Sequence, residues 1–249
     1  MANMVAENNE KRSADRMVIF DCDGVLVDSE TLSAQVMLEM AERLGVSFDT
    51  SAALAFIQGR KVADWVAELG ETAGQEIPGD FVREFRARCA AAFDRDLAGI
   101  EGVEAVLGGL EEQYCCASSA PPDKIRHTLG HTGLLRFFSA DRVHSAYEVG
   151  IWKPDPGLFL HAAETHGVRP DRCAVVEDSA PGVLAGLRAG MTVFGYAPDG
   201  TPPAGPHAVP GDQVTWFGAM RELPALLRRW SSNLPSPAAT VPTRNGGIS

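Results

Sequence analysis

The short apolar segment Met17–Phe20 ends abruptly at Asp21-Cys22-Asp23-Gly24, and comparable segments reappear only much later in the chain. Uniformly apolar runs of this length are typical of strands buried on both faces of a parallel sheet. The later runs are Tyr114–Ala117, Cys173–Val176 and Met191–Phe194, with Arg142–His144 as a shorter candidate. A sheet built from these runs must therefore accept a long insertion between its first strand and all the others.

The inserted stretch carries helical patterns and no strand pattern. Leu32, Val36, Met40 and Leu44 recur at every fourth position, and Gly45 then provides a stop signal. Further helices are expected at residues 51–57, 62–69 and 81–93. We therefore predict a small α-helical domain over residues 32–98, inserted after the first strand.

After residue 99, apolar runs alternate with helical segments, which is the pattern of βαβ units and of a parallel sheet. The predicted fold class is α/β, a Rossmann-like parallel sheet with helices on both faces, formed by residues 16–31 and 99–230. Residues 197–212 hold five prolines and three glycines and are expected to form a loop. A flexible N-terminal tail is expected at residues 1–15, and a disordered C-terminal tail at 231–249.

The charge balance argues against two classes of partner. Lys and Arg number 22 against 33 for Asp and Glu, which gives a formal net charge of −11. Such a chain has no broad basic face for nucleic acid or for an anionic membrane surface. The five cysteines form no CxxC pair, which fits a reducing compartment. We expect a cytoplasmic monomer or weak homodimer that binds neither nucleic acid nor a membrane.

Four polar clusters lie at the ends of predicted strands: Asp21-Cys22-Asp23-Gly24, Ala117-Ser118-Ser119, Trp152-Lys153-Pro154 and Val176-Glu177-Asp178-Ser179. Each alone has an ordinary explanation, since Asp-Gly is a turn pair and serine or acidic residues commonly begin helices. Ligands of open α/β sheets, however, bind beyond the carboxyl ends of the strands. Carboxylates, a hydroxyl and a lysine arriving at one sheet edge therefore indicate a site.

These residue types match the needs of phosphoryl transfer. Asp21 and Asp23 are two residues apart, so on extended backbone both side chains leave the chain on the same side. One carboxylate can act as nucleophile and the other as proton donor and acceptor. Lys153 would offset the negative charge of a phosphomonoester, and Ser118 would donate a hydrogen bond to a phosphate oxygen.

A carboxylate that attacks a phosphate dianion also requires a cation to screen the repulsion. Mg²⁺ prefers oxygen ligands and binds through one or two carboxylates together with substrate phosphate and water. Asp178, with Glu177 alongside, can complete such a site with the first pair of aspartates.

On these motifs the chain resembles the haloacid dehalogenase (HAD) superfamily of aspartate phosphotransferases, in the branch with a helical cap (subclass I). Residues 21–30 are similar to its DxDGxxxDSE opening, and Ser118 is similar to its second motif. Lys153–Pro156 resembles the third motif and Glu177-Asp178 the fourth. The resemblance covers Met17 to about Trp230 and implies a phosphatase core with an inserted cap over residues 32–98.

The resemblance implies roles for these residues. Asp21 would be the nucleophile that forms an aspartyl-phosphate, and Asp23 the general acid and base. Mg²⁺ would bind to Asp21, the Asp23 carbonyl and the Asp178 carboxylate, with Glu177 as a further candidate ligand. Substrate contacts are expected from a second set of residues, namely Ser119, Gly59, Arg60 and Lys61.

Phosphatases and β-phosphoglucomutases of the superfamily share these motifs. The mutase pattern has a histidine twelve residues after the nucleophile, where this chain has Ser33. It has an arginine three residues past a cap-loop glycine, where this chain has Val62, and a lysine after the second-motif serine, where this chain has Pro121-Pro122. These departures favour hydrolysis, with the mutase as the alternative.

The substrate class follows from weaker similarities. Residues 100–103, 151–156 and 190–194 are similar to 6-phosphogluconate phosphatase-type members, so a small sugar phosphate or phosphorylated sugar acid is expected. A non-catalytic phosphometabolite-binding protein on the same fold is the alternative from another class, although its motifs would be eroded. The six histidines show no metal-ligand spacing and are expected at the surface or in helix packing.

Overall fold

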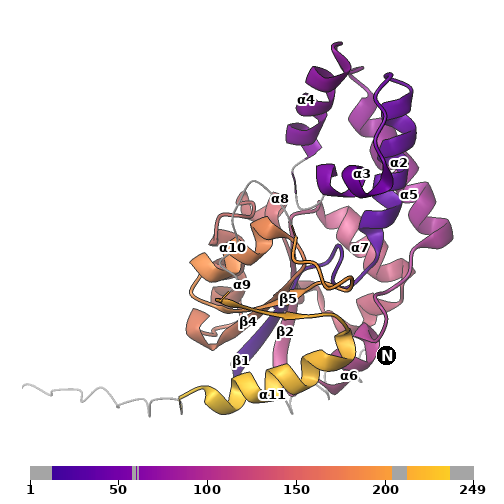
Figure 1. Ribbon diagram of the computed structural model, residues 1–249. Coiled ribbons are helices and arrows are strands. Elements are labelled where there is room, and N and C mark those ends of the chain that lie inside the picture. Colours follow the sequence, from indigo (N-terminus) through magenta and orange to yellow (C-terminus); the bar gives the residue numbers. More distant parts are fainter. Residues whose placement is uncertain (1–12, 58–59, 61, 204–211, 236–249) are drawn as a thin grey trace, which may run out of the picture.

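The computed structural model describes residues 13–57, 60, 62–203 and 212–235. Over these residues the strands form one parallel sheet in the order β3-β2-β1-β4-β5-β6 (Figure 1). Their bounds are β1 Ser13–Phe20, β2 Glu112–Ser118, β3 Val143–Ser145, β4 Cys173–Glu177, β5 Thr192–Tyr196 and β6 Val214–Phe217. The predicted α/β class with a parallel sheet is therefore confirmed.

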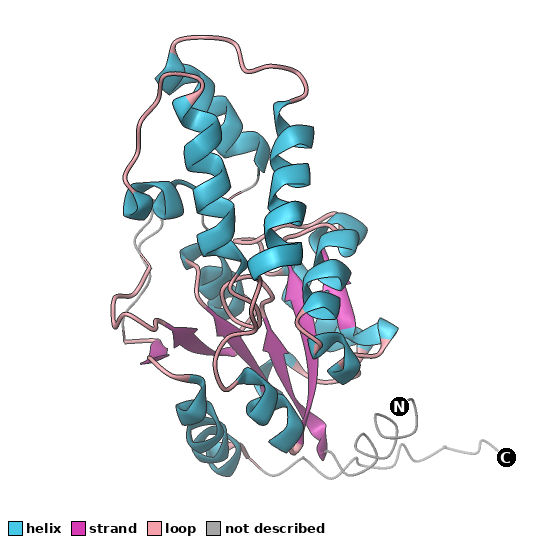
Figure 2. Ribbon diagram, turned by 90° about the vertical axis from the view of Figure 1, so that its right-hand side faces the viewer, coloured by secondary structure: helices cyan, strands magenta, loops and turns pink. Residues whose placement is uncertain are grey.

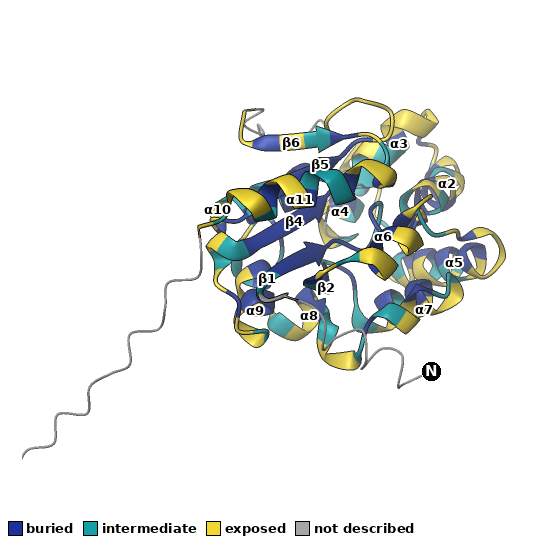
Figure 3. Cartoon of the chain, turned by 90° about the horizontal axis from the view of Figure 1, so that it is seen from below, coloured by how far each residue is buried: buried dark blue, intermediate teal, exposed yellow. Residues whose placement is uncertain are grey.

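Helices cover both faces of the sheet because successive strand residues point to opposite sides. Met17 and Ile19 join a core under α8 (Ala146–Val149), α9 (Gly157–Thr165) and α10 (Ala180–Arg188). Val18 and Phe20 join the opposite core, under α6 (Val103–Gly109), α7 (Pro122–His131) and α11 (Leu223–Asn233). Seen from below, the central strands are buried between these two helical layers (Figure 3).

The inserted residues form a helical cap above the sheet (Figures 1 and 2). Its helices are α2 (Ser29–Glu42), α3 (Thr50–Ile57), α4 (Val62–Ala73) and α5 (Phe81–Asp96). Trp65 is 1% exposed and lies with its ring centroid 5.0 Å from that of Phe85 and 6.3 Å from that of Phe81. Aromatic burial at the centre of the cap thus holds α4 against α5.

The two connections between the sheet and the cap lie side by side. Val27 forms an antiparallel bridge with Gly99, and the Asp28 N–H donates to the Ala98 carbonyl at 3.0 Å. We interpret this paired segment as the junction of the cap. Because α2 already begins at Ser29, its first turn lies three residues before the predicted cap boundary of 32 and beside the strand ends.

The ordered elements extend into both predicted tails, by three residues at each end. Strand β1 begins at Ser13, where it pairs with Glu112, and Arg172 binds Asp15 through its carboxylate and through its carbonyl at 2.8 Å. Helix α11 runs to Asn233 because the buried Trp230 anchors its last turns. Residues 1–12 and 236–249 of the two expected tails lie outside the described residues.

Strand β6 extends the sheet by pairing with β5, and helix α11 packs on it; neither element was predicted from the sequence. Val214 and Phe217 are buried, whereas Thr215 between them is exposed, as expected for an edge strand. Within the described part of the chain, no helix has the length and apolar character needed to cross a bilayer.

Candidate active site

Three parallel strands deliver polar side chains to the same sheet edge. Asp21 follows β1, Ser118 ends β2, and Glu177 and Asp178 lie at the end of β4. The chain winds from β1 toward β2 and β3, and then returns to β4 on the other side of β1. The β1–β4 boundary is the switch point at which α/β sheets bind ligands.

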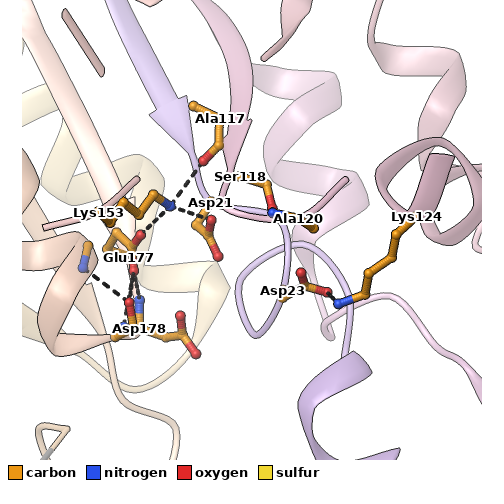
Figure 4. A network of polar contacts seen from close by, with 11 residues as sticks. Asp21, Asp23, Ala117, Ser118, Ala120, Lys124, Lys153, Glu177 and Asp178 are labelled. Atoms are coloured by element: carbon orange, nitrogen blue, oxygen red, sulfur yellow. Dashed lines mark hydrogen bonds and ion pairs between the residues drawn. The ribbon is translucent and has the colours of Figure 1, made fainter. Parts of the chain in front are cut away.

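Lys153 is the central residue of the polar network at this sheet edge (Figure 4). Its Nζ lies 2.5 Å from Asp21 Oδ1, 2.6 Å from Glu177 Oε1 and 3.1 Å from the Ala117 carbonyl. Its side chain is only 4% exposed, and those of Asp21 and Glu177 are 10% and 0% exposed. A buried ammonium group paired with two carboxylates on neighbouring strands is held in one place.

The second carboxylate oxygen of Glu177 binds the residues that precede helix α10. Oε2 accepts hydrogen bonds from the backbone N–H groups of Asp178 and Ser179 at 3.1 Å and from the Ser179 hydroxyl at 2.9 Å. Gly182 in α10 is essential to this packing, since an added Cβ would lie 1.8 Å from Glu177 Oε1. Both oxygens of Glu177 therefore already have donors.

Burial and neighbouring charges shift the pKa values of Asp21 and Lys153. Burial raises the pKa of Asp21 to about 7 although Lys153 opposes it, and the Glu177 and Asp23 carboxylates add to the increase. Burial acts against the charge on Lys153, yet Asp21 and Glu177 outweigh it and hold the pKa of Lys153 above its usual value. The site thus holds more negative than positive charge around its nucleophile candidate.

Asp23 has a different set of partners. Lys124 Nζ lies 2.9 Å from Asp23 Oδ1, and the Ser29 hydroxyl donates to the same oxygen. Burial alone would raise the pKa of Asp23, but Lys124 and the Ser29 hydrogen bond outweigh it and lower that pKa. The two aspartates of the first motif are therefore paired with different lysines and have different pKa values: burial and nearby carboxylates raise that of Asp21, whereas Lys124 and Ser29 lower that of Asp23.

The carboxylates at this edge form a donor set suited to a hard divalent cation. One oxygen each from Asp21, Glu177 and Asp178 lies within 4.8 Å of the others. Glu30, from the first turn of α2, shares a hydrogen bond with Asp178, and burial together with Asp23 and Asp21 raises its pKa to about 8. Crowded oxygen ligands with excess negative charge are what Mg²⁺ or a similar ion requires.

Gly24 lets the first loop approach this carboxylate cluster. Its φ is +79°, and an added Cβ would lie 2.0 Å from Asp178 Oδ2. Only glycine combines this backbone conformation with this close approach. The Asp-Gly pair of the first motif is thus explained by the position of Asp178.

A cavity of about 390 Å³ separates these residues from the cap. Ser118 and Ser119 line it, and the Ser118 hydroxyl accepts the Ala120 N–H at 3.0 Å, which leaves its own proton for a ligand. Arg60 also lines the cavity, but it is paired with Glu68 at 2.6 Å. The other two expected cap residues, Gly59 and Lys61, lie outside the described residues.

Some cavity residues were not expected from the sequence. They are Glu30, Arg86, Lys124, His127, Tyr147 and Trp152. Arg86 of the cap reaches the Tyr147 hydroxyl of the core at 3.3 Å, and His127 of the core lies 3.0 Å from Asp94 of the cap. No sequence spacing singles these residues out, although Lys124 is the third residue of α7, the helix that follows β2.

Comparisons with known proteins agree with this geometry. The sequence model of the haloacid dehalogenase-like hydrolases matches residues 16–190. The 6-phosphogluconate phosphatase of Escherichia coli (strain K12) is 32% identical over 219 residues, which cover 84% of this chain and 93% of that protein. The β-phosphoglucomutase of Mycobacterium bovis is 33% identical over 210 residues, with 70% and 78% covered. A HAD family hydrolase from Deinococcus radiodurans R1, solved with bound phosphate and sodium, has a TM-score of 0.69 at 29% identity, with 88% and 97% covered.

Proposed function

This chain belongs to the haloacid dehalogenase-like hydrolase family, and we propose that it is a Mg²⁺-dependent phosphatase of a small phosphorylated sugar or sugar acid. One observation carries the proposal. Asp21 is held beside Lys153 while Asp23 is held beside Lys124, and both aspartates line the same cavity. A nucleophile and a proton carrier are thus separately positioned around one substrate space.

In the first step, an oxygen of Asp21 attacks the phosphorus atom and the ester P–O bond breaks. The leaving alkoxide takes a proton from Asp23, and an aspartyl-phosphate remains on Asp21. Lys153 keeps the Asp21 carboxylate in place and balances charge on the transferring group, while the Ser118 hydroxyl donates to a phosphate oxygen. A phosphate dianion beside Lys124 also competes for its charge, which favours the protonated form of Asp23 needed here.

In the second step, water attacks the phosphorus of the aspartyl-phosphate. Asp23 accepts the proton of that water, the P–O bond to Asp21 breaks, and inorganic phosphate leaves. Asp23 lies on the cavity side of the loop, with the cap above it, so the reacting water is one admitted to the cavity rather than bulk solvent.

We assign the Mg²⁺ site to the carboxylates of Asp21 and Asp178, which lie within 4.8 Å of each other, together with the Asp23 carbonyl, and Glu177 is the further candidate ligand. When bound, Mg²⁺ would neutralise charge on the phosphoryl group and on these carboxylates. Because both Glu177 oxygens already accept hydrogen bonds, we assign Glu177 mainly to holding Lys153 and the start of α10.

Hydrolysis is favoured over mutase activity by the residue at position 33. Ser33 lines the cavity where the mutase pattern has a histidine, and its hydroxyl donates to the Ser29 carbonyl of its own helix at 2.8 Å. It offers no imidazole to a second sugar hydroxyl. The mutase remains the second candidate, since a β-phosphoglucomutase is among the relatives.

The substrate class rests on the cavity and on the relatives. Arg60, Arg86 and Lys124 bring positive charge to a space of the size of a phosphorylated sugar, and Arg60 and Arg86 come from the cap. One relative is named for 6-phosphogluconate and another is a hexitol phosphatase A from Escherichia coli, 30% identical over 193 residues. We also propose a cytoplasmic location, supported by five buried cysteines that form no disulfide.

The test is a panel of sugar phosphates and phosphorylated sugar acids assayed for released phosphate with Mg²⁺ and with a chelator. The proposal expects turnover that requires Mg²⁺ and is lost in Asp21→Asn. Equal turnover in chelator, or full activity of Asp21→Asn, contradicts it. Incubation with β-glucose 1-phosphate separates the candidates, because a mutase gives glucose 6-phosphate and a phosphatase gives free phosphate. Binding without turnover of any panel member would indicate the non-catalytic binding protein.

A further inference from the structure

A second group of metal-ligating side chains lies away from the cavity, under helix α9. Cys115 is on β2, His144 is on β3, and His166 is the residue that ends α9. One ligand atom from each lies within 4.8 Å of the others. His161, one turn earlier on α9, has its ring centroid 5.5 Å from that of His144. Three segments distant in sequence thus bring two or three imidazoles and a thiol together.

Strand register explains this convergence. His144 pairs with Ala117 of β2, and Cys115 lies two residues before Ala117 on the same face of the sheet. Alternation therefore points Cys115 and His144 to one side, toward α9. His144 is 6% exposed and Cys115 is fully buried, whereas His161 is exposed and leads outward to solvent.

The separation of the two imidazole nitrogens suits a tetrahedral site. His144 Nε2 and His166 Nε2 lie 3.2 Å apart. Two nitrogens bound to one Zn²⁺ at about 2.0–2.1 Å in tetrahedral geometry would lie roughly 3.3 Å apart. We propose that Cys115, His144 and His166 form a second cation site, which binds Zn²⁺ with His161 or water as the fourth ligand.

The surrounding charges suit this ion. Burial and the neighbouring imidazoles lower the pKa of His144 to about 4, and burial and Arg142 lower that of His166, so both rings are neutral near pH 7. Neutral imidazole is the ligand form. Burial raises the pKa of the Cys115 thiol, so binding would release its proton to solvent and leave a thiolate on the metal.

The set of two imidazoles and a thiolate selects borderline ions such as Zn²⁺ over Mg²⁺, which prefers oxygen. Mg²⁺ and Zn²⁺ would therefore be sorted between the two sites by ligand chemistry.

The site would tie together the elements that carry the catalytic residues. Cys115 is three residues before Ser118 on β2, and His144 precedes Ser145, whose hydroxyl donates to the Ala120 carbonyl at 2.7 Å. A cation joining β2, β3 and the end of α9 would hold these strand ends in register. The alternative is a packing cluster in which one imidazole N–H donates to the other ring.

The experiment uses the full chain, stripped of metal and held in excess Mg²⁺ so that the carboxylate site is saturated. Zn²⁺ is titrated against a chromophoric chelator, and Co²⁺ is added separately as a spectroscopic probe. We expect one tightly bound Zn²⁺ per chain, a raised melting temperature with Zn²⁺, and a thiolate-to-Co²⁺ charge-transfer band. Loss of a ligand weakens metal binding by more than about tenfold.

Two variants have matched controls. Cys115→Ser should lose the charge-transfer band while Cys173→Ser, a buried thiol of the same core that donates to the Arg169 carbonyl, keeps it. His166→Asn should weaken Zn²⁺ binding while His131→Asn, at an exposed position on α7, does not. If Cys115→Ser does not fold, the His166 pair decides the question.

Failure to retain Zn²⁺ in excess Mg²⁺, or a charge-transfer band that survives in Cys115→Ser, overturns the second site. All readouts are taken without substrate, so they are independent of the phosphatase proposal.

Discussion

Lys153 Nζ lies 2.5 Å from Asp21 Oδ1 at a depth where the lysine side chain is 4% exposed. The contact joins a residue on the loop before α9 to the end of β1, and Glu177 at the end of β4 shares the same ammonium at 2.6 Å. The nucleophile candidate is thus oriented by a buried cation and not by solvent. Removing that cation leaves two carboxylates buried side by side.

Lys153→Met keeps much of the stem of the side chain and removes its charge. We expect kcat/KM to fall by about 10²–10³, the usual effect of removing one donor that stabilises charge in a transition state. Stability should fall by about 3–5 kcal/mol, because Asp21 and Glu177 lose their counter-charge. Steady-state kinetics with Mg²⁺ and chemical denaturation measure both effects, and unchanged kinetics in a folded variant would contradict the assigned role.

Asp23→Asn removes the proton carrier and leaves the nucleophile in place. We expect kcat to fall by about 10²–10⁴, as for loss of a general acid–base catalyst. The hydrolytic step needs the base, so an activated aryl phosphate should leave a labelled aspartyl-phosphate that survives acid quenching. The matched control is Asp28→Asn, an exposed carboxylate in the same loop, which should behave as wild type. A variant of Asp23 that turns over normally would remove Asp23 from the mechanism.

Gly24→Ala tests the close approach of the first loop to Asp178. Its matched control is Gly74→Ala, because both glycines have positive φ but only Gly24 has a neighbour within reach of an added Cβ. The control should lose about 1 kcal/mol of stability through its backbone alone. Gly24→Ala should in addition displace Asp178 and raise the Mg²⁺ concentration needed for half-maximal activity. An equal Mg²⁺ requirement in both variants would show that Asp178 does not take part in metal binding.

Much of this site follows from local sequence. Apolar runs predict parallel strands, and residues that end such strands meet at one edge, which brings Asp21, Ser118 and Asp178 together without further knowledge. Lys153 was expected at the same sheet edge, where it pairs with Asp21. The helical cap is also predictable from the sequence, since the periodic helices begin directly after the first motif.

The missed features depend on tertiary docking. Lys124 reaches Asp23 only because α7 starts beside the first loop, and Arg86 lines the cavity only because α5 leans over α8. His144 and His166 are 22 residues apart in the chain, so no sequence spacing announces their contact. Strand β6 was not predicted because its exposed Thr215 interrupts the apolar run.

The cluster under α9 also gives the metal-free chain a pH-dependent stability. Burial, His166 and His161 lower the pKa of His144 to about 4 although Asp141 opposes them, whereas an unfolded histidine titrates near 6.5. Between these values the unfolded chain binds a proton that the folded chain does not, so stability falls as pH falls from 6.5 to 4. Chemical denaturation in EDTA should show that the free energy of unfolding falls by on the order of 2 kcal/mol between pH 6.5 and 4.

The check on this dependence is a histidine pair. His144→Gln should reduce the slope of the stability profile between pH 6.5 and 4 to the part that His166 contributes, while His131→Gln, at an exposed position on α7, should leave it as in the wild type. Identical slopes for wild type and His144→Gln would assign the pH dependence to other groups.

Two glycine-to-alanine variants distinguish the effect of helix propensity from the effect of displacing Glu177, which holds Lys153. Gly108→Ala in α6 meets nothing closer than 3.9 Å and should stabilise the chain by about 0.5–1 kcal/mol, as alanine does in a helix. Gly182→Ala in α10 gains the same propensity, but its Cβ would lie 1.8 Å from Glu177 Oε1. Glu177 must then move, and with it the ammonium of Lys153, so stability and kcat should fall together. If Gly182→Ala lowered stability but left kcat and its pH profile unchanged, Glu177 would be a structural residue only, and Lys153 would hold Asp21 without its help.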